Sequence, residues 1–416
     1  MSVPEPGAPG TALAGLPATH HAAVRLGDAD YQSDPAAVFR ELRKAHGPVA
    51  PVLLPGDVPA WLVLGYSEVR RVCRAPDIFT RDLACWRLAD TLPPDWPLWP
   101  LFGGGQAGNS LLYTAGPAHR RRASALNAAL SGIDRGEFAM HCEQFGQQLV
   151  AGFAAAGRAE LMADYALQLP AMTVGRALGV PAEDGPVLVA DVVTVVTGGP
   201  DAIAAQQRSR EVIARLVDAS RTRPGTHVAA RLAAHPAGLS RKQLVEDLVL
   251  TLTAALLPTA YLLGNAARLI LNNERHTDAF VRGRQTVDNA IHAVLWDDTP
   301  TQVYGGRFTT ETVRLGDYDL PAGDLVLLAF AAANTDPHIR PDLTADLQGS
   351  KAYLSYSHGE HGCPDAARGL SQVMAATGID VLLDALPGLR LACSEKELQW
   401  NPSPWMRGLQ ALPVRF

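Results

Sequence analysis

The stretch from Tyr353 to Gly369 reads YLSYSHGEHGCPDAARG, and the interpretation of the whole chain starts from it. It begins with a short apolar run, becomes polar and rich in Gly, and reaches Cys363 before an Ala-rich helical pattern that ends near Leu386. Gly359 and Gly362 permit backbone conformations that a side chain would block. They also let the backbone approach closely whatever Cys363 contacts.

Pro364 directly follows the cysteine and suits the first turn of a helix, where its missing N–H is not needed. A thiol at a helix N-terminus is favoured as the thiolate by the helix dipole, and the thiolate is the form that ligates metals. The pattern therefore indicates a metal-ligating cysteine, with a buried cysteine beside a Gly-rich turn as the alternative.

The loop resembles the haem-binding loop of the cytochrome P450 family, whose pattern is Phe-Gly-x-Gly-x-His-x-Cys. The eight residues that end at Cys363 read YSHGEHGC, so that Gly359, His361 and Cys363 match, while Tyr356 and Ser357 replace the Phe and the first Gly. The resemblance implies a mainly α fold with small β-sheets. It also implies that haem b (iron protoporphyrin IX) is held between a long central helix and this loop, with Cys363 as the iron ligand.

Composition limits the class of protein. The chain has 416 residues, of which 47% are hydrophobic and 19% charged, as in a globular protein with a substantial core. A formal charge of −6 argues against a general nucleic-acid binder. No run of about 18 uninterrupted apolar residues suggests a membrane span, and the start lacks the features of a signal peptide. We therefore expect a cytoplasmic protein without a membrane contact, as in the bacterial type of the resembled family.

The cysteines and the termini bear on organisation. Five cysteines are scattered without the paired spacing of a zinc site or a disulfide framework. Residues 1–24 are rich in Pro, Gly and Ala, and we expect a disordered N-terminal tail there. No repeat or linker divides the remainder, so residues 25–416 are expected to form a single cytochrome P450 domain. Within it, Val49–Val52 and Ala60–Leu64 are predicted to be paired strands.

Three further stretches concern the pocket. Asp82–Asn109 holds three Trp, four Pro and a run of three Gly, which indicates either a packed surface loop or a lid over a pocket. Val187–His235 is helical in pattern with a break at Gly198, and the resemblance makes it a mobile roof. Leu244–Leu271 is the longest apolar helical stretch, and Pro258 in its middle should kink it.

Haem propionates are carboxylates and require cationic or hydrogen-bonding donors. By resemblance, Arg307 and His361 are two of these donors, although for Arg307 alone a surface ion pair would be the ordinary interpretation. His119 is a third donor, at the start of the helical pattern that follows Gly116-Pro117. The family has an Arg four residues after this His, where Ala123 stands here. That contact is then absent or made by a neighbouring arginine (Arg121 or Arg122).

The long helix of the family carries Ala-Gly-x-Asp/Glu-Thr over the iron, where the acid and the alcohol relay protons to dioxygen. We match this pattern to Ala255–Thr259, which reads ALLPT. Thr259 is then the retained catalytic alcohol, Pro258 stands at the acid position, and Leu256 stands at the Gly position, where it would crowd dioxygen.

A second departure is structural. The Glu-x-x-Arg motif of the family reads AVLW at 293–296, and the Arg that completes the charged triad falls at Gln348. Loss of one member of a buried ionic network would leave an uncompensated charge, which destabilises by roughly 3–5 kcal/mol. Because all three charges are absent together, we predict a rewired fold.

The function predicted from these residues is that of a haem-thiolate monooxygenase. It would oxidise a small organic substrate with electrons from a ferredoxin and ferredoxin reductase. The missing acid at Pro258 favours an alternative, a peroxide-driven or coupling haem enzyme, because peroxide brings its own protons. Leu256 and the missing triad favour a third, a non-catalytic haem or ligand-binding scaffold.

Overall fold

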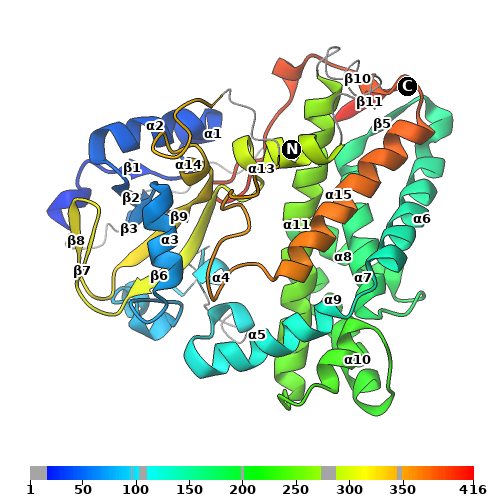
Figure 1. Cartoon of the computed structure of the whole chain (residues 1–416), viewed down its shortest axis with the longest axis horizontal. Coiled ribbons are helices and arrows are strands. Elements are labelled where there is room, and N and C mark those ends of the chain that lie inside the picture. Colours follow the sequence, from blue (N-terminus) through cyan, green and yellow to red (C-terminus); the bar gives the residue numbers. More distant parts are fainter. Residues whose placement is uncertain are drawn as a thin grey trace.

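The computed structural model shows a helical part beside a part that contains most of the strands (Figure 1). It describes residues 16–94, 96, 98–102, 110–197, 201–272, 287–343 and 349–416. This architecture confirms the predicted mainly α fold with small sheets.

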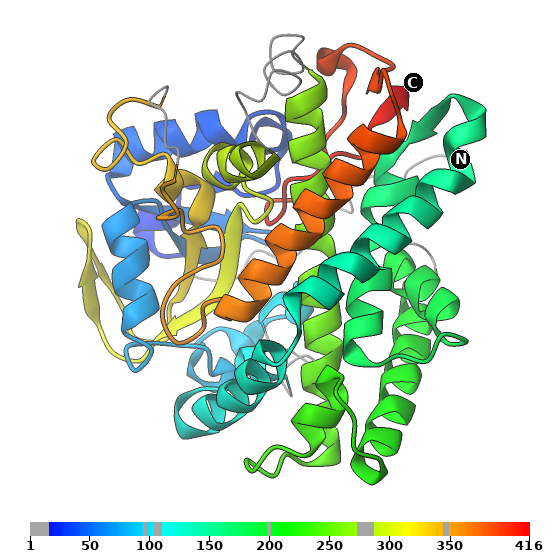
Figure 2. The ribbon, with the colours of Figure 1, turned by 45° about the vertical axis from the view of Figure 1, so that its right-hand side comes forward.

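The helical part is built around α11 (Arg241–Leu271). This helix contacts α7, α9, α13 and α15, and both views show α15 running beside it (Figures 1 and 2). The other helices of this part are α5 (Gly116–Ser131), α6 (Arg135–Phe153), α7 (Gln168–Leu178), α8 (Gly185–Thr197), α9 (Ala202–Thr222), α10 (Val228–Ala233), α13 (Val287–Asp297) and α15 (Asp365–Ala385).

Helix α11 begins at a capping box, in which the Ser240 side chain accepts from the Gln243 backbone and the Gln243 side chain accepts from the Ser240 backbone. It continues through Pro258 without interruption. Of the described helices, it is the one whose length and composition would allow a membrane crossing. Its packing against four other helices is that of a core helix.

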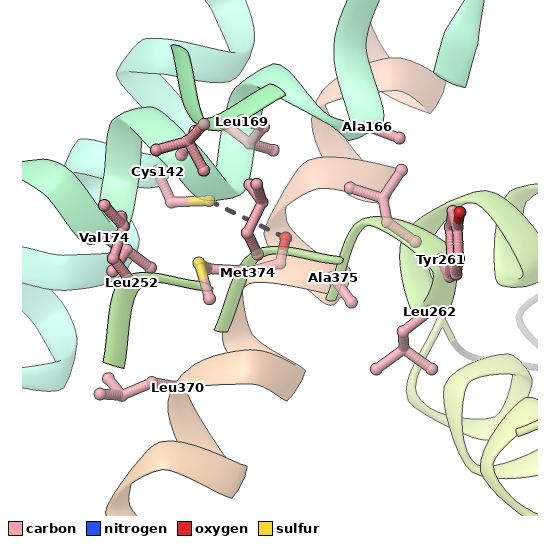
Figure 3. Packing of buried hydrophobic residues seen from close by; sticks show 14 of the residues in the cluster. Cys142, Ala166, Leu169, Val174, Leu252, Tyr261, Leu262, Leu370, Met374 and Ala375 are labelled. Carbon is pink, nitrogen blue, oxygen red and sulfur yellow. Dashed lines mark hydrogen bonds between the residues drawn. The ribbon is translucent and has the colours of Figure 1, made fainter. Parts of the chain in front are cut away.

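The core between α11 and its neighbours is apolar (Figure 3). Leu252 and Leu262 of α11, Met374 of α15 and Leu169 of α7 all belong to this core. The Cys142 thiol donates to the Met374 carbonyl at 3.8 Å, so this cysteine is a core residue. This packing fixes the position of α15, and therefore of the cysteine loop that precedes it.

The strands form a sheet of six in the order β1-β2-β3-β9-β6-β4, with two smaller sheets. The predicted strand pair is confirmed as β2 and β3, which are antiparallel with Val49 opposite Val63. The strands are β1 (Val24–Arg25), β2 (Val49–Leu54), β3 (Val58–Val63), β4 (Phe79–Thr80), β5 (Arg158–Glu160), β6 (Val303–Thr309), β7 (Val313–Leu315), β8 (Tyr318–Leu320), β9 (Leu325–Ala329), β10 (Arg390–Leu391) and β11 (Pro413–Arg415). Helices α1 (Ala29–Ser33), α2 (Pro35–His46), α3 (Tyr66–Arg74), α4 (Trp99–Phe102) and α14 (Phe330–Asn334) accompany the six-stranded sheet.

The predicted disordered tail does not extend over residues 16–24. A turn of 3-10 helix, Ala18–His20, buries His20, whose Nε2 lies 3.1 Å from the Ala60 carbonyl. Val24 pairs with Val52 in the sheet. Residues 16–24 are therefore part of the fold, which corrects the prediction there, and residues 1–15 lie outside the described residues.

The Trp-rich stretch packs on the sheet. Trp86 stacks on Phe308 of β6, Trp96 stacks on Phe102, and the Trp96 indole N–H donates to the Pro55 carbonyl at 2.8 Å. These contacts favour the packed-loop interpretation for the described part of 82–109. The lid role stays a prediction because residues 103–109 lie outside the description, as does the predicted helix break at Gly198.

Candidate functional site

The cysteine loop is held by its own backbone. The Cys363 N–H donates to the Tyr356 carbonyl at 2.9 Å, and the Gly362 N–H donates to the Gly359 carbonyl at 2.9 Å. Gly359 has a φ of +72°, and a side chain there would collide with the Cys73 carbonyl of α3. Glycine is therefore required for the loop to reach α3. Cys363 lies at the bend two residues before α15, with Pro364 at the N-cap position.

Ser357 stands where the matched pattern has its first glycine. Its φ is +61°, the left-handed region that a non-glycine residue occupies with strain. Its Oγ lies 3.8 Å from the Cys73 Sγ. The loop therefore keeps its conformation without the glycine that favours it.

Burial controls the Cys363 thiol. It raises the pKa of Cys363 to about 11, with a smaller lowering by Arg368 and a further raising by Asp365. In the metal-free protein, burial therefore opposes the predicted stabilisation of the thiolate by the helix dipole, because a charged sulfur would lose its contact with water. A metal ion that binds the sulfur displaces this proton.

Buried cations without anionic partners lie close together next to the loop. Arg307 of β6 is 1% exposed, and none of its three side-chain nitrogens has a hydrogen-bond partner in the described part of the chain. Burial, and then the charge of Arg81, lowers the pKa of Arg307 to about 9. Both ring nitrogens of His361 also lack a partner there, and burial followed by the charges of Arg307 and Arg81 lowers the pKa of His361 far below its ordinary value.

This group of side chains requires an anion. Buried charge without a partner is strongly destabilising, and Arg307 and Arg81 make no ion pair with the described carboxylates. Two carboxylates placed among Arg307, Arg81 and His361 would satisfy these donors. The residues present therefore fit the propionates of haem, and one of them, His361, belongs to the loop that carries Cys363.

His119 of α5 reaches the same place but is differently engaged. Its Nδ1 lies 3.2 Å from the Leu111 carbonyl and its Nε2 lies 3.1 Å from the Glu360 carbonyl. Its ring is 3.9 Å from the His361 ring. His119 therefore orders the loop against α5, and its predicted propionate contact stays a prediction. His119, Glu360 and His361 also satisfy the distances of a metal site, but the occupied nitrogens of His119 favour the structural role.

The predicted substitutes for the missing arginine at Ala123 are wrong. Arg122 forms a buried ion pair with Asp247 of α11, and Arg121 donates to the Ala237 carbonyl at 2.7 Å. The additional cation of the site is Arg81, which follows β4 and lies 4.6 Å from the Tyr304 ring centroid. Sequence reasoning missed it, because a single Arg after a strand of two residues carries no pattern.

Thr259 lies on the packed face of α11. It is 1% exposed, and its hydroxyl donates to the Ser371 Oγ of α15 at 3.1 Å. Leu256, one turn earlier, is also buried in the core. The geometry thus contradicts both the predicted relay role of Thr259 and the predicted crowding by Leu256.

A different face of α11 is open. Ala254 is exposed in the middle of this core helix, and Leu257 and Pro258 are half-buried. Residues three and four apart share a helix face, so these three form one patch. The side chains of these three residues are apolar and can relay no proton. The hydroxyls of the neighbouring Thr251 and Thr253 donate to backbone carbonyls of the helix. The match of the oxygen-binding pattern was therefore displaced by one residue, because neighbouring positions on a helix point to different faces.

The place of the charged triad is rewired. The Trp296 indole N–H donates to the Ser350 carbonyl at 3.1 Å, and the Arg340 guanidinium lies 5.2 Å from the Trp296 ring centroid. Arg340 is buried and pairs with Asp297 at 2.6 Å. This agrees with the predicted rewiring, although Arg340 was not foreseen and Gln348 lies outside the described residues.

The chain was compared with known proteins. No family model matches it. Cytochrome P450 monooxygenase PikC from Streptomyces venezuelae is 29% identical over 402 residues, which cover 93% of this chain and 92% of that protein. Vitamin D(3) 25-hydroxylase from Pseudonocardia autotrophica is 29% identical over 92% of this chain and 94% of its own length.

Solved structures give the same result. The ligand-free P450 monooxygenase TamI aligns with a TM-score of 0.81 at 27% identity, over 95% of this chain and 94% of its own. CYP154C4 from Streptomyces sp. ATCC 11861 aligns with a TM-score of 0.82 at 26% identity, over 94% and 98% respectively. The likeness therefore extends over nearly the whole chain in both sequence and fold.

Proposed function

Because the chain belongs to the cytochrome P450 family and is an oxidoreductase that binds haem b, we propose that it is a monooxygenase supplied with electrons by a ferredoxin-type partner. Its substrate would be a small, largely apolar organic molecule. The observation that carries the proposal is the group of buried polar side chains beside the Cys363 loop. The nitrogens of Arg307 and of the His361 ring have no hydrogen-bond partner among the described residues, and the buried Arg81 donates to the Gly305 carbonyl at 3.3 Å.

In this proposal the residues divide the work of holding the cofactor. The Cys363 sulfur is the axial ligand, and its thiolate supplies the electron density that favours O–O cleavage when haem is bound. Arg307 and His361 hold the propionates, Arg81 adds charge, and His119 keeps the loop against α5. Gly359 fixes the loop backbone close to α3.

The substrate side is formed by α11 and the two helices above it. A small apolar cavity between α8, α9 and α11 is lined in part by Val192, Ile213 and Leu252. Together with the open patch of Ala254, Leu257 and Pro258, it supports a largely apolar substrate, because most of the lining is apolar. The polar lining residues are Gln206, Ser209 and Thr253. The roof role of α8 and α9 agrees with this placement.

The partner would bind at the cysteine side. Arg70, Arg74 and Arg368 all lie near His358 of the loop, where their charges add to burial in lowering the pKa of His358. Arg74 and Arg120 are exposed there. A basic surface around the loop favours an acidic electron-transfer protein. We also propose that residues 25–416 act as one domain and that the protein is cytoplasmic, like the soluble bacterial members of the family.

One spectrum tests the core of the proposal. The haem-loaded protein is reduced with dithionite and treated with carbon monoxide, and the absorbance band of thiolate-ligated haem is expected. Cys363→Ser should abolish that band, and Cys393→Ser, at a half-buried cysteine outside the site, should retain it. A wild-type protein that takes up no haem, or that lacks the thiolate band, contradicts the proposal.

A second candidate function is favoured by the hydrogen bond from Thr259 to Ser371. With no protic side chain on the open patch of α11, peroxide is a better oxidant than dioxygen, because it carries its own protons. Turnover of a substrate panel with hydrogen peroxide is compared with turnover with NAD(P)H, ferredoxin reductase and ferredoxin. Faster turnover with peroxide supports this candidate, and faster turnover with ferredoxin supports the monooxygenase. No turnover in either case supports the non-catalytic scaffold.

A further inference from the structure

Three aromatic side chains form a line that leads away from the cysteine loop. The first is Tyr356, whose carbonyl accepts the hydrogen bond from the Cys363 N–H at 2.9 Å. Its ring centroid is 6.2 Å from that of Tyr353, which in turn is 5.7 Å from that of Trp296. We call Tyr356, Tyr353 and Trp296 the aromatic line. Phenol and indole rings are the side chains most easily oxidised by one electron, and such close spacing allows an electron to pass between them.

The Tyr353 hydroxyl has a proton acceptor. The Gln372 Nε2 donates to this hydroxyl at 3.0 Å, and the Nδ1 of His292 lies 3.1 Å from it. In the His292 tautomer that is protonated on Nε2, Nδ1 accepts the phenolic hydrogen, while the Gln372 amide N–H donates to the same hydroxyl. Burial, and then the charge of Lys351, lowers the pKa of His292, which favours the neutral imidazole beside the phenol. Loss of an electron from Tyr353 can therefore be accompanied by a short proton transfer.

The far end of the line is blocked. The buried guanidinium of Arg340 lies over the Trp296 ring, 5.2 Å from its centroid. A cation at this position opposes the positive charge of an oxidised indole. Tyr353, with its base, is therefore the place in the line where oxidation is most favourable.

We propose that Tyr356 and Tyr353 form a one-electron path out of the haem pocket, in which Tyr353 is the electron donor and His292 the proton acceptor. This rests on the proposed haem site. Hydrogen peroxide would take two electrons from the haem protein and two protons from the solvent and leave as two molecules of water, so that the haem protein is oxidised by two electrons. Tyr353 returns one of these electrons through Tyr356, and its phenolic proton passes to His292 Nδ1. A neutral tyrosyl radical and an imidazolium remain, with the second oxidising equivalent elsewhere on the haem protein. Two electrons from reduced ferredoxin, delivered one at a time, restore the starting state as His292 returns its proton to Tyr353.

The path has a use in this particular chain. Helix α11 offers no protic side chain on its open patch, so an oxidised protein without substrate has no protonated group there to assist its decay. An electron from Tyr353 on the opposite side relieves the oxidation before it damages the pocket.

The test is electron paramagnetic resonance on haem-loaded protein mixed with hydrogen peroxide and frozen quickly. A tyrosyl signal is expected in the wild type and should be lost in Tyr353→Phe. Tyr318→Phe is the matched control, because Tyr318 also has a histidine partner, with its hydroxyl 2.8 Å from His46 Nδ1, but lies on β8. His292→Gln keeps a hydrogen-bonding side chain with a much weaker base and should also lose the signal.

Two outcomes overturn the proposal. One is an unchanged signal in both Tyr353→Phe and His292→Gln. The other is a signal lost only in Tyr304→Phe, which would place the radical beside Arg81. Each sample is first checked for the thiolate band with carbon monoxide, so that a failure of the haem site itself is seen separately. If one of Tyr353→Phe and His292→Gln does not fold, the signal of the other variant still tests the proposal.

Discussion

The two sides of the proposed haem pocket have diverged to different degrees. On the cysteine side, Cys363, His361 and Arg307 keep the residues of the family pattern. Arg307 lies close enough to His361 to lower its pKa, and the loop is fixed by Gly359. On the α11 side, the open patch consists of Ala254, Leu257 and Pro258, and the alcohol of Thr259 is turned into the core. The side that binds the cofactor is retained, and the side that would deliver protons is replaced.

This difference separates two requirements that usually occur together. Holding haem requires buried cations and a thiol, and their removal would leave a cavity lined by unpaired groups. Activating dioxygen requires protons at the iron, and their loss leaves the fold intact. A chain can therefore lose the second set while it preserves the first.

The largest effect is expected for Arg307→Met. Without haem, this change removes an unpaired buried charge and should raise the free energy of unfolding by roughly 3–5 kcal/mol. With haem, it removes a propionate donor and should speed haem loss. Denaturant unfolding measures the stability of the apoprotein, and haem transfer to a scavenger protein measures haem loss from the holoprotein. A variant that stabilises the apoprotein and speeds haem loss identifies Arg307 as a cofactor ligand. Arg314→Met on the exposed face of β7 should change neither, and a less stable apo variant would contradict the assignment.

Pro258→Thr sharpens the comparison from the other side. It places a hydroxyl on the open patch and restores a helix hydrogen bond, whose absence at a proline in a helix interior destabilises by about 3 kcal/mol. We expect ferredoxin-driven turnover to rise several-fold relative to peroxide-driven turnover. Thr259→Val should leave that ratio unchanged because its hydroxyl faces Ser371. If Thr259→Val instead strongly lowers the ratio of ferredoxin-driven to peroxide-driven turnover, the relay role predicted for Thr259 from the sequence is correct.

A smaller, pH-dependent effect is expected at His361. Its lowered pKa means that the folded apoprotein keeps this ring neutral, while the unfolded chain protonates it below about pH 6.5. The unfolded state then binds more protons, so stability falls as the pH falls below that value, by up to about 1.4 kcal/mol per pH unit from this group. His361→Gln should flatten the dependence, as measured by unfolding between pH 7.5 and 5.5 (roughly the window set by the ordinary histidine pKa). His21→Gln, at an exposed position, should leave it as it is.

The smallest effect is expected at Ser357. Its φ of +61° is strained for serine and ordinary for glycine. Ser357→Gly should therefore stabilise the apoprotein by up to about 1 kcal/mol, offset in part by the greater freedom of glycine in the unfolded chain. Ser67→Gly in the first turn of α3 is the control and should destabilise. Equal losses in both variants would mean that the loop conformation is not strained.

Much of the fold was predictable because its signals are local or depend on a motif. The strand pair at Val49 and the cysteine loop follow from alternation, turn residues and an eight-residue pattern. The boundary of the N-terminal tail was not predictable, because His20 is fixed by a contact with the distant residue Ala60 that no neighbouring residue indicates.

The site was predictable where a residue matched the motif directly. The site was not predictable where the role of a residue depends on the helix face on which it lies or on its burial. The family pattern was matched one position too far along α11. Thr259 was therefore assigned to the open face of the helix, on which Pro258 lies instead. Arg81 and Arg340 are buried cations whose partners lie far away in the sequence, so their roles could not be read from their neighbours.

The stacking of Arg340 on Trp296 makes the residues allowed at these two positions depend on each other. Restoring the arginine of the family motif at position 296 alone would set two guanidinium groups against each other in a dry interior, with Asp297 already committed to one of them. Replacing Arg340 alone would expose an indole face to an empty space. Positions 296 and 340 can therefore be exchanged without loss only when both are changed together.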